Sequence, residues 1–307
     1  IGYMMLAAGI GPAGWAFAIF HLLTHGFFKA NMFLGAGSVM HAMGDDVNMR
    51  NFGALRKMVP ITFWTFAMGY LAIIGFPGWA GYFSKDHIIE AAFEHGLVFG
   101  LAAMLGAGVT AFYMTRLMFM TYFGQQRWND GVHPHESPLT MTVPLVILAA
   151  LSVVGGLLMN GWIQGWLSPA IGSQVHEAGL LPTPVGWLTL GIVAAGVALG
   201  WYLFGRRPVP KTAPVSSNPL TIAGRSDLFA DAVNNALVVR PTMLVADATV
   251  ATDTWVIDRG VDGLGTLFTK LSALGRRMQT GQVRSYALLM TAGAVLVGVL
   301  VILGQLG

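Results

Sequence analysis

The chain has 307 residues, of which 55% are hydrophobic and only 10% charged, and its mean hydropathy is +0.64. These values exclude an ordinary soluble domain and indicate a polytopic membrane protein. The chain contains no cysteine, which excludes disulfides, thiol chemistry and cysteine-ligated iron–sulfur clusters. The net charge of +3 comes from basic residues scattered among loops and not gathered in one patch, so we expect no nucleic-acid partner.

The first predicted helix covers residues 1–11 and is too short to cross a bilayer. It stops at the turn formed by Gly11 and Pro12. Because the chain begins without Met, without a signal peptide and without a complete first span, we expect it to be the C-terminal part of a longer protein.

The second predicted helix, over residues 14–43, is long enough to span a membrane and carries charge where charge is costly. His21, His25 and Lys29 follow at intervals of four residues, so their side chains share one face of the helix. Lys29 lies near mid-span, too far from either end to reach the headgroups comfortably. An ionisable residue at that depth indicates a functional site, commonly a proton relay. The structural alternative is a neutral histidine pair with a lysine tied to a neighbouring carboxylate for assembly.

The third predicted span is discontinuous. It is apolar over 61–74 and then reaches the sequence GFPGWAG at 75–81, where a proline and three glycines disfavour a regular helix. We expect a second half-helix that begins at Lys85, with Ser84 as its N-cap. Lys85 and Asp86 would then lie at a break inside the membrane, and such breaks mark ion sites in transporters. The structural alternative is that Asp86 complements the helix dipole and Lys85 neutralises it.

Three more spans are expected over residues 97–123, 139–160 and 185–204, and a final one over 285–306. The sequence therefore predicts an all-α polytopic membrane protein with about seven transmembrane helices, the first incomplete and one discontinuous. Residues 1–205 would form a membrane helix bundle, residues 206–225 a cytoplasmic linker, and residues 282–307 the C-terminal transmembrane helix.

Residues 226–281 have a different character, because charged residues alternate with apolar residues spaced at three and four. The apolar positions are Ile257, Val261, Leu264, Phe268, Leu271 and Leu274. The segment is too polar to span, so we expect an amphipathic helix lying along the membrane, roughly 80 Å long at 1.5 Å per residue. Pro241 and the glycine cluster at 260–265 predict bends in it.

The basic residues predict the orientation. Alternating the spans places on one side Arg50, Arg56, Lys57, Arg127, Arg206, Arg207, Lys211 and Arg225. The opposite loops, around residues 95–96 and 161–184, contain no Lys or Arg. The positive-inside rule assigns the basic side to the cytoplasm.

Residues 21–42, the loop NMRNFGALRKMVP and the segment GFPGWAGYFSKDHI resemble the large antiporter-like (NuoL-type) subunit of respiratory complex I and the related Mrp-type cation/proton antiporter subunits. The resemblance covers essentially the whole chain and corresponds to the C-terminal half of the subunit. It implies that Lys29, His25 and His21 belong to a buried proton-transfer axis, which continues at Lys85 and Asp86. The bundle would then hold the distal half of an antiporter-like proton channel, and the amphipathic helix would be the lateral helix that clasps neighbouring subunits.

The function implied by this resemblance is that of a proton-translocating membrane subunit of NADH:quinone oxidoreductase in the bacterial cytoplasmic (inner) membrane. The chain itself would carry no redox chemistry, no metal and no cofactor, and NADH, FMN, iron–sulfur clusters and quinone are expected in other subunits. The expected partners are other complex I membrane subunits, the lipid bilayer and protons. The alternative is an Mrp-type cation/proton antiporter subunit, although the lateral helix with one closing span favours complex I.

A redox or metal-binding membrane protein is a third class, and the histidine spacing disfavours it. Two histidines four residues apart on one helix cannot supply the opposite axial ligands of one haem, and no HExxH motif occurs.

Overall fold

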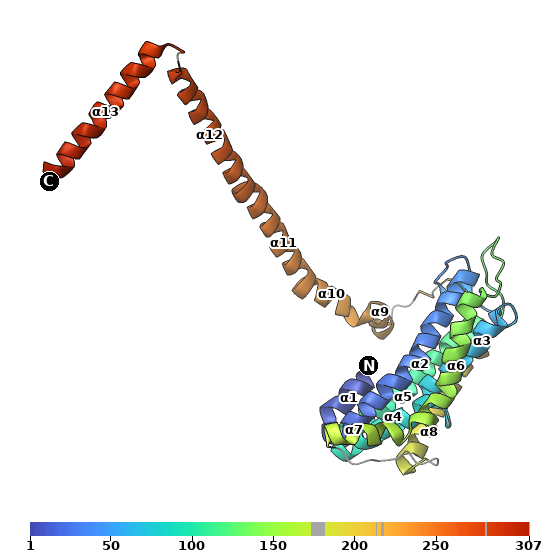
Figure 1. The fold of residues 1–307 in the computed structure, drawn as a ribbon. Helices are drawn as coiled ribbons and strands as arrows, with labels where there is room; N and C mark the ends of the chain where they lie inside the picture. The colour runs from blue at the N-terminus through green and yellow to red at the C-terminus, as the bar shows by residue number, and fades with distance from the viewer. Residues whose placement is uncertain (173–181, 213, 216–217, 280, 307) are drawn as a thin grey trace. The chain divides into compact units, whose positions relative to one another are not determined.

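The computed structural model describes residues 1–172, 182–212, 214–215, 218–279 and 281–306 (Figure 1). These residues fall into two units, Ile1–Pro214 and Val215–Gly307, which we describe separately. The described residues form helices and turns and no strand, which confirms the all-α class. Four described helices are long and apolar enough to cross a membrane: Leu97–Tyr122, Leu139–Met159, Pro184–Gly205 and Val283–Gln305.

The first unit is a bundle built around α2. Its helices are α1 (Gly2–Ile10), α2 (Pro12–Ala42), α3 (Pro60–Ile74), α4 (Ala80–His95), α5 (Leu97–Tyr122), α6 (Leu139–Met159), α7 (Trp162–Ile171) and α8 (Pro184–Gly200). Helix α2 packs against α1, α3, α4, α6 and α7, whereas α5 packs against α3, α4 and α8. Helix α2 therefore contacts both α3 and α4, the two halves of the interrupted third span, and its side chains can position the residues on both of them.

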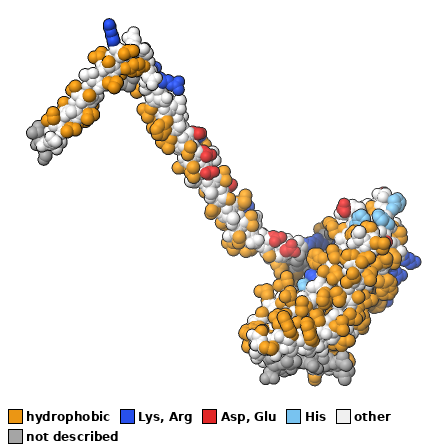
Figure 2. All heavy atoms as spheres, in the orientation of Figure 1, with side chains coloured by type: hydrophobic (Ala, Val, Ile, Leu, Met, Phe, Trp, Pro, Cys, Tyr) orange, Lys and Arg blue, Asp and Glu red, His pale blue; other side chains and the backbone are white. Residues whose placement is uncertain are grey.

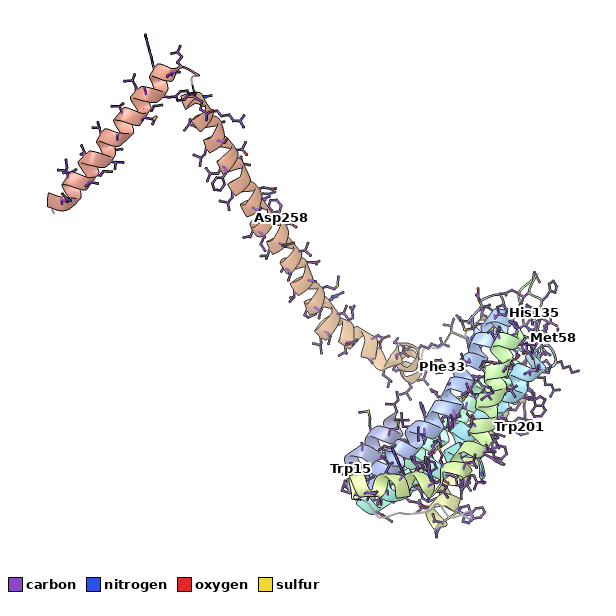
Figure 3. The ribbon with its side chains drawn as sticks, in the orientation of Figure 1. Trp15, Phe33, Met58, His135, Trp201 and Asp258 are labelled. Carbon is purple, nitrogen blue, oxygen red and sulfur yellow. The ribbon has the colours of Figure 1, made fainter. Side chains whose placement is uncertain are left out.

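Helix α2 begins at a forced turn. Gly11 has a φ of +93°, a region that favours glycine, and Pro12 occupies the first helical position, where its missing N–H costs nothing. The 31 residues that follow give a helix about 46 Å long at 1.5 Å per residue, longer than the ~30 Å hydrocarbon core. Trp15 and His135 lie towards opposite ends of the bundle (Figure 3).

The break in the third span is present, but the second half-helix begins earlier than predicted. Helix α3 ends at Gly75, which has a φ of +80°, and α4 begins at Ala80 after Trp79. Ser84 is consequently inside α4 and is not its N-cap. The reason is a close approach that the sequence pattern did not reveal: a Cβ on Gly81 would lie 1.9 Å from the Ala72 carbonyl oxygen, so only glycine lets the first turn of α4 pack on α3.

Helix α7 lies in a stretch predicted to be a loop. Its ten residues include Gly165 and the internal Pro169, which lower helix propensity and obscure the periodicity. Burial compensates for this, because Ile163 and Leu167 pack with Phe20 and the aromatic rings at the start of α4. At about 15 Å this helix is too short to cross a bilayer. Residues 173–181 of the same predicted loop lie outside the described residues.

A buried arginine organises the loops on the basic side. The Arg127 guanidinium is 8% exposed and donates to the carbonyls of Arg50 (2.9 Å) and Met120 (2.7 Å), and also to those of Met49 and Gln125. One side chain thus joins the end of α5 to the loop that follows α2.

Replacing Arg127 by Gln should lower the free energy of unfolding by about 2–3 kcal/mol, because one buried and three partly buried hydrogen bonds to carbonyls lose their donor. The thermal midpoint of the purified full-length protein would measure this change. Lys57→Gln, an exposed basic residue in the same region, is the matched control and should leave the midpoint unchanged. Equal midpoints for the two variants would contradict the organising role.

The second unit is a long helix followed by a second one. The long helix runs through α10 (Ala230–Asn234), a π-helical stretch (Asn235–Val239), α11 (Arg240–Thr252), a second π-helical stretch (Asp253–Asp258) and α12 (Arg259–Met278). It is about 73 Å long by its rise per residue. Before it lie α9 (Pro219–Arg225) and three residues of positive φ, Asp227–Phe229. After it, Gly281 with a φ of +68° leads into α13 (Val283–Leu306).

The predicted bends of the long helix differ from those observed. Pro241 lies in the first turn of α11, where proline is tolerated, and the glycines at 260–265 are helical within α12. The irregular turns are the two π-helical stretches. The apolar stripe of α12, formed by Val261, Leu264, Phe268, Leu271 and Leu274, is exposed within this unit, and Figure 2 shows hydrophobic side chains along the helix.

Candidate functional site

The face of α2 that carries His21, His25 and Lys29 has the predicted arrangement. The His21 and His25 rings have centroids 5.9 Å apart, and His21 is 4% exposed whereas His25 and Lys29 are half-buried. The Lys29 amine lies 5.4 Å from the centroid of Phe33, which is itself exposed at the edge of the bundle (Figure 3). Lys29 has no hydrogen bond or ion pair within the described part of the chain, so the alternative of a lysine tied to a carboxylate finds no support there.

His21 connects α2 to the second half of the broken span. Its Nδ1 lies 2.8 Å from Ser84 Oγ on α4, and the same Oγ lies 2.8 Å from Thr24 Oγ1 on α2. All three side chains are buried. The sequence pattern did not predict this contact, because it favours Ser84 as the N-cap of the half-helix. In the structure α4 begins at Ala80, so Ser84 lies inside the helix and contacts α2.

Tyr3 lies between His21 and Lys85. Its ring meets His21 edge-on at a centroid distance of 6.2 Å, and the Lys85 amine lies 4.9 Å from the same ring centroid. The Tyr3 hydroxyl donates to the Ala103 carbonyl at 2.6 Å, which fixes the ring. No motif marks this tyrosine in the sequence, because it reaches the site only through the packing of α1 against α2 and α4.

Lys85 and Asp86 are buried, 4% and 8% exposed, in the second turn of α4. The Lys85 amine donates to the carbonyl of Ile73 at 3.4 Å, in the last turn of α3, where carbonyls lack helical partners and a cation is favourable. The two residues form no ion pair with each other, because neighbours on a helix point about 100° apart. A Cβ added to Gly75 would lie 4.0 Å from both side chains, so the pair flanks the break.

Glu90 continues the polar side chains of α4 towards α8. Its Oε2 lies 3.1 Å from His87 Nδ1, and its Oε1 accepts a hydrogen bond from the Thr183 hydroxyl. Thr183 is the N-cap of α8 and also accepts from the Gly186 N–H at 3.1 Å. The start of α8 is thereby fastened to α4.

Several buried polar atoms around α4 have no hydrogen-bond partner among the described residues: Trp79 Nε1, Asp86 Oδ2, His87 Nε2 and both amide atoms of Gln164. Buried polar groups are ordinarily paired, and where protein atoms do not pair them, ordered water usually does. This concentration distinguishes α4 from most of the bundle, where Asn31 and Tyr122 are the other described residues of this kind.

A second polar stripe on α2 consists of Thr24, Asn31 and Ser38, spaced by seven residues and each 0% exposed. Asn31 donates to the Thr65 carbonyl at 2.7 Å, and Ser38 Oγ lies 2.7 Å from Thr62 Oγ1. Through these bonds and the Thr24–Ser84 contact, α2 is hydrogen-bonded to both halves of the interrupted span. Polar contacts of this kind hold transmembrane helices together.

The described residues contain no group of three or more His, Cys, Asp or Glu side chains that could hold a metal ion. His133 and His135, which form an HxH sequence in the loop after α5, belong to no such group there. The second of them, His135, instead meets the His41 ring edge-on at 5.7 Å.

Comparison with known proteins gives consistent matches. Residues 1–111 match the model of the family described as NADH:quinone oxidoreductase/Mrp antiporter, TM. The chain is 52% identical to NADH-quinone oxidoreductase subunit L of Mycobacterium tuberculosis, over 100% of this chain and 49% of that protein. It is 35% identical to NAD(P)H-quinone oxidoreductase chain 5 of a Picosynechococcus strain, over 96% of this chain and 50% of that protein. The chain thus spans about half the length of these curated relatives.

Two solved structures share the fold. One is the membrane-bound sulfane sulfur reductase (MBS), an archaeal respiratory membrane complex, with a TM-score of 0.52 and 25% identity over 98% of this chain and 50% of that chain. The other is the Mrp complex from Dietzia sp., with a TM-score of 0.57 and 21% identity over 89% of this chain and 30% of that chain. The second likeness concerns the fold alone.

Proposed function

We propose that this chain belongs to the NADH:quinone oxidoreductase/Mrp antiporter family, whose model its residues 1–111 match, and that it is the C-terminal part of a proton-translocating membrane subunit of NADH:quinone oxidoreductase. The multi-pass protein would lie in the bacterial cytoplasmic (inner) membrane. Its role is proton transfer, whereas NADH, FMN, iron–sulfur clusters and quinone belong to other subunits of the complex.

The observation that carries this proposal is the row of ionisable groups that joins α2 to α4, half-buried at Lys29 and His25 and buried from His21 to Lys85 and Asp86. Protons pass along α2 through Lys29, His25 and His21 and reach Lys85 by way of the Ser84 hydroxyl, whereas the Tyr3 ring packs between His21 and Lys85 and carries no proton between them. Imidazole and amine groups exchange protons, and ionisable residues at membrane depth are typical of such relays. The row is supported by the centroid distances of 5.9 Å and 6.2 Å and by the 2.8 Å contact with Ser84.

We place the exit beside Asp86. The unpaired buried atoms of Trp79, Asp86 and His87 favour a hydrated region around the start of α4. This region lies beside a break whose backbone, in a bilayer, must face protein or water. Water there would connect Asp86 with the side opposite the basic loops.

The flank of α2 around Lys29 would pack against another part of the membrane complex. Leu22, Phe33 and Leu34 are 55%, 69% and 48% exposed on this helix, and Lys29 finds no polar partner in the described residues. The segment over 226–281, which contains the long helix from α10 to α12, would contact neighbouring membrane subunits, with residues 206–225 as a cytoplasmic linker and residues 282–307 as the closing transmembrane helix. Its exposed apolar stripe supports this role.

Cysteine labelling tests the placement of the long helix. Cysteines at Asp258 and Asp262 should react with an impermeant reagent from the cytoplasmic side, because a polar face at the membrane surface stays in water. A cysteine at Leu264, on the apolar stripe, is the matched control and should react at least about tenfold more slowly. This chain contains no native cysteine to interfere. Labelling of the two Asp positions only from the periplasm would reject the topology.

The second candidate function is an Mrp-type cation/proton antiporter subunit, which the family description also names. Purification of the full-length protein from its native membrane decides between the two. Co-purification with a hydrophilic arm that contains flavin and iron–sulfur clusters supports the complex I assignment. Co-purification with small membrane subunits alone, and sodium-dependent proton movement, supports the antiporter.

A further inference from the structure

We propose that the groove between α3 and α8 binds an anionic phospholipid, with one acyl chain along the groove and the headgroup phosphate at Arg206 and Arg207. This inference is independent of proton transfer. It rests on the shape of the groove, its depth and the charge at one of its ends.

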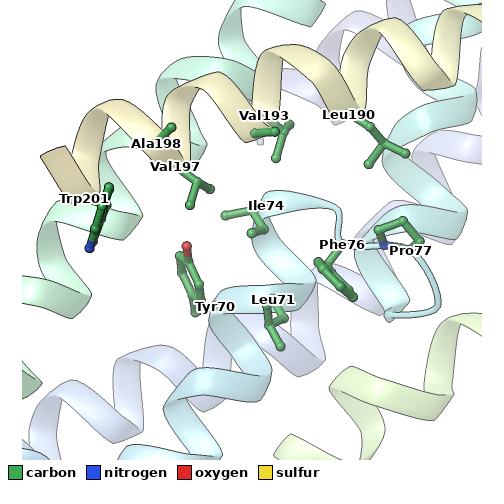
Figure 4. A pocket seen from close by; sticks show the side chains of 11 residues that line it. Tyr70, Leu71, Ile74, Phe76, Pro77, Leu190, Val193, Val197, Ala198 and Trp201 are labelled. Carbon is green, nitrogen blue, oxygen red and sulfur yellow. The ribbon is translucent and has the colours of Figure 1, made fainter. Parts of the chain in front are cut away.

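The groove has a volume of about 530 Å³ and is lined almost entirely by apolar side chains (Figure 4). One wall consists of α3 and the break, from Tyr70 to Pro77. The other consists of α8 from Leu190 onwards and of Trp201, the first residue of the π-helical stretch (Trp201–Gly205) that continues it. The volume lies in the range typical of small-molecule sites, about 300–1,000 Å³. No charged side chain lines it, so the occupant's contacting part is apolar.

The length of the groove matches one leaflet. From Leu190 to Trp201, eleven residues of helix rise about 16 Å at 1.5 Å each. Half of a ~30 Å hydrocarbon core is about 15 Å. At one end lie Phe76 and Pro77 of the break, and at the other lies Trp201, an aromatic of the kind that marks the membrane interface. The groove thus runs from mid-membrane to the interface, as an acyl chain does.

The interfacial end is basic. The Arg206 guanidinium lies 5.4 Å from the Trp201 ring centroid, and the Arg207 guanidinium lies 5.2 Å from that of Tyr202. Both arginines are exposed, and neither has an acidic partner in the part of the chain that the structure describes. Arg50 donates to the Pro210 carbonyl at 2.8 Å, which holds the following segment against the bundle. An apolar slot that ends at two unpaired cations fits an anionic phospholipid.

A transmembrane helix is a poorer fit for the groove. A helix packs over a groove with its side chains alone, so volume does not distinguish the two occupants. An apolar helix would, however, leave the two arginines without counter-charge. Phosphatidylglycerol and cardiolipin share the required chemistry, an anionic phosphate on acyl chains.

The test is photo-crosslinking in native membranes that contain the full-length protein. Phosphatidylglycerol with a diazirine in its acyl chain is compared with phosphatidylcholine carrying the same diazirine, and labelled peptides are identified by mass spectrometry. We expect the peptides containing residues 70–77 and 190–198 to be labelled at least about fivefold more by phosphatidylglycerol.

Two pairs of variants separate the acyl chain from the headgroup. Ala194→Phe fills the groove and should reduce labelling several-fold, whereas Ala195→Phe, the next residue on α8 but not in the lining, should not. Arg206→Gln with Arg207→Gln should remove the preference for phosphatidylglycerol but keep residual labelling of the groove. Equal labelling by the two lipids in the wild type would overturn the proposal, and so would unlabelled groove peptides, which would mean that a protein helix covers this face.

Discussion

Replacing Lys29 by Ala should reduce proton transfer through the full-length subunit about 100-fold or more, the loss typical when a positioned proton carrier is removed. Assembly should persist, because Lys29 makes no hydrogen bond or ion pair in the described residues whose partner would be left unpaired. The measurement is proton uptake per electron in vesicles that contain the whole complex. Lys57→Ala, an exposed loop lysine, is the matched control and should pump as the wild type does.

Lys29→Arg should be nearly as harmful as Lys29→Ala. A guanidinium keeps the positive charge but holds its proton too tightly to exchange it. The comparison therefore separates proton exchange from charge. Wild-type pumping in Lys29→Ala would refute the role of this residue, and full rescue by Arg would show that only its charge matters.

Lys85→Ala should reduce proton transfer by about the same factor as Lys29→Ala, but at a later step of the proposed relay. The Lys85 amine is the last cationic group of the row, and its only protein acceptor in the described residues is the Ile73 carbonyl at 3.4 Å. Removing it separates His21 from Asp86. Proton pumping and quinone reduction should be measured together, since the expected result is electron transfer with little pumping. Glu94→Gln on the same helix, at an exposed position, is the matched control.

Asp86→Asn keeps the shape of the side chain and removes the carboxylate. Asp86 Oδ2 has no partner among the described residues, so the exchange should not disturb folding. Pumping should slow by a smaller factor than in Lys85→Ala, because the lysine remains but the group that passes its proton to water is lost. If both variants pump at wild-type efficiency, the pair serves only to stabilise the helix end and the exit lies elsewhere.

Helical periodicity was sufficient to predict the histidine–lysine face. The spacing of His21, His25 and Lys29 fixes a common face on any α-helix, and the structure has it. The break at 75–79 was equally predictable, since proline and glycine act on the local backbone. Local patterns therefore located the row on α2 and the interruption of the next span.

The contacts that join these two elements could not be predicted. Tyr3 is brought to the site by the packing of α1, and Ser84 by a start of α4 that depends on Gly81 passing close to Ala72. Helix α7 was missed because burial against α2 outweighs its weak propensity. Each miss concerns tertiary packing, which one sequence without its relatives does not encode in a local pattern.

The orientation of the Ser84 hydroxyl on α4 depends on whether His21 Nδ1 carries a proton. A hydroxyl has a single hydrogen, yet Ser84 Oγ lies 2.8 Å from both His21 Nδ1 and Thr24 Oγ1. When Nδ1 is bare, Ser84 must point its hydrogen at the ring, and Thr24 then donates to Ser84. When Nδ1 carries a proton, the ring donates and Ser84 turns its hydrogen towards Thr24 or the Ala80 carbonyl, 3.4 Å away. The direction of the Ser84 O–H bond, in the second turn of α4, therefore records whether His21 Nδ1 carries a proton.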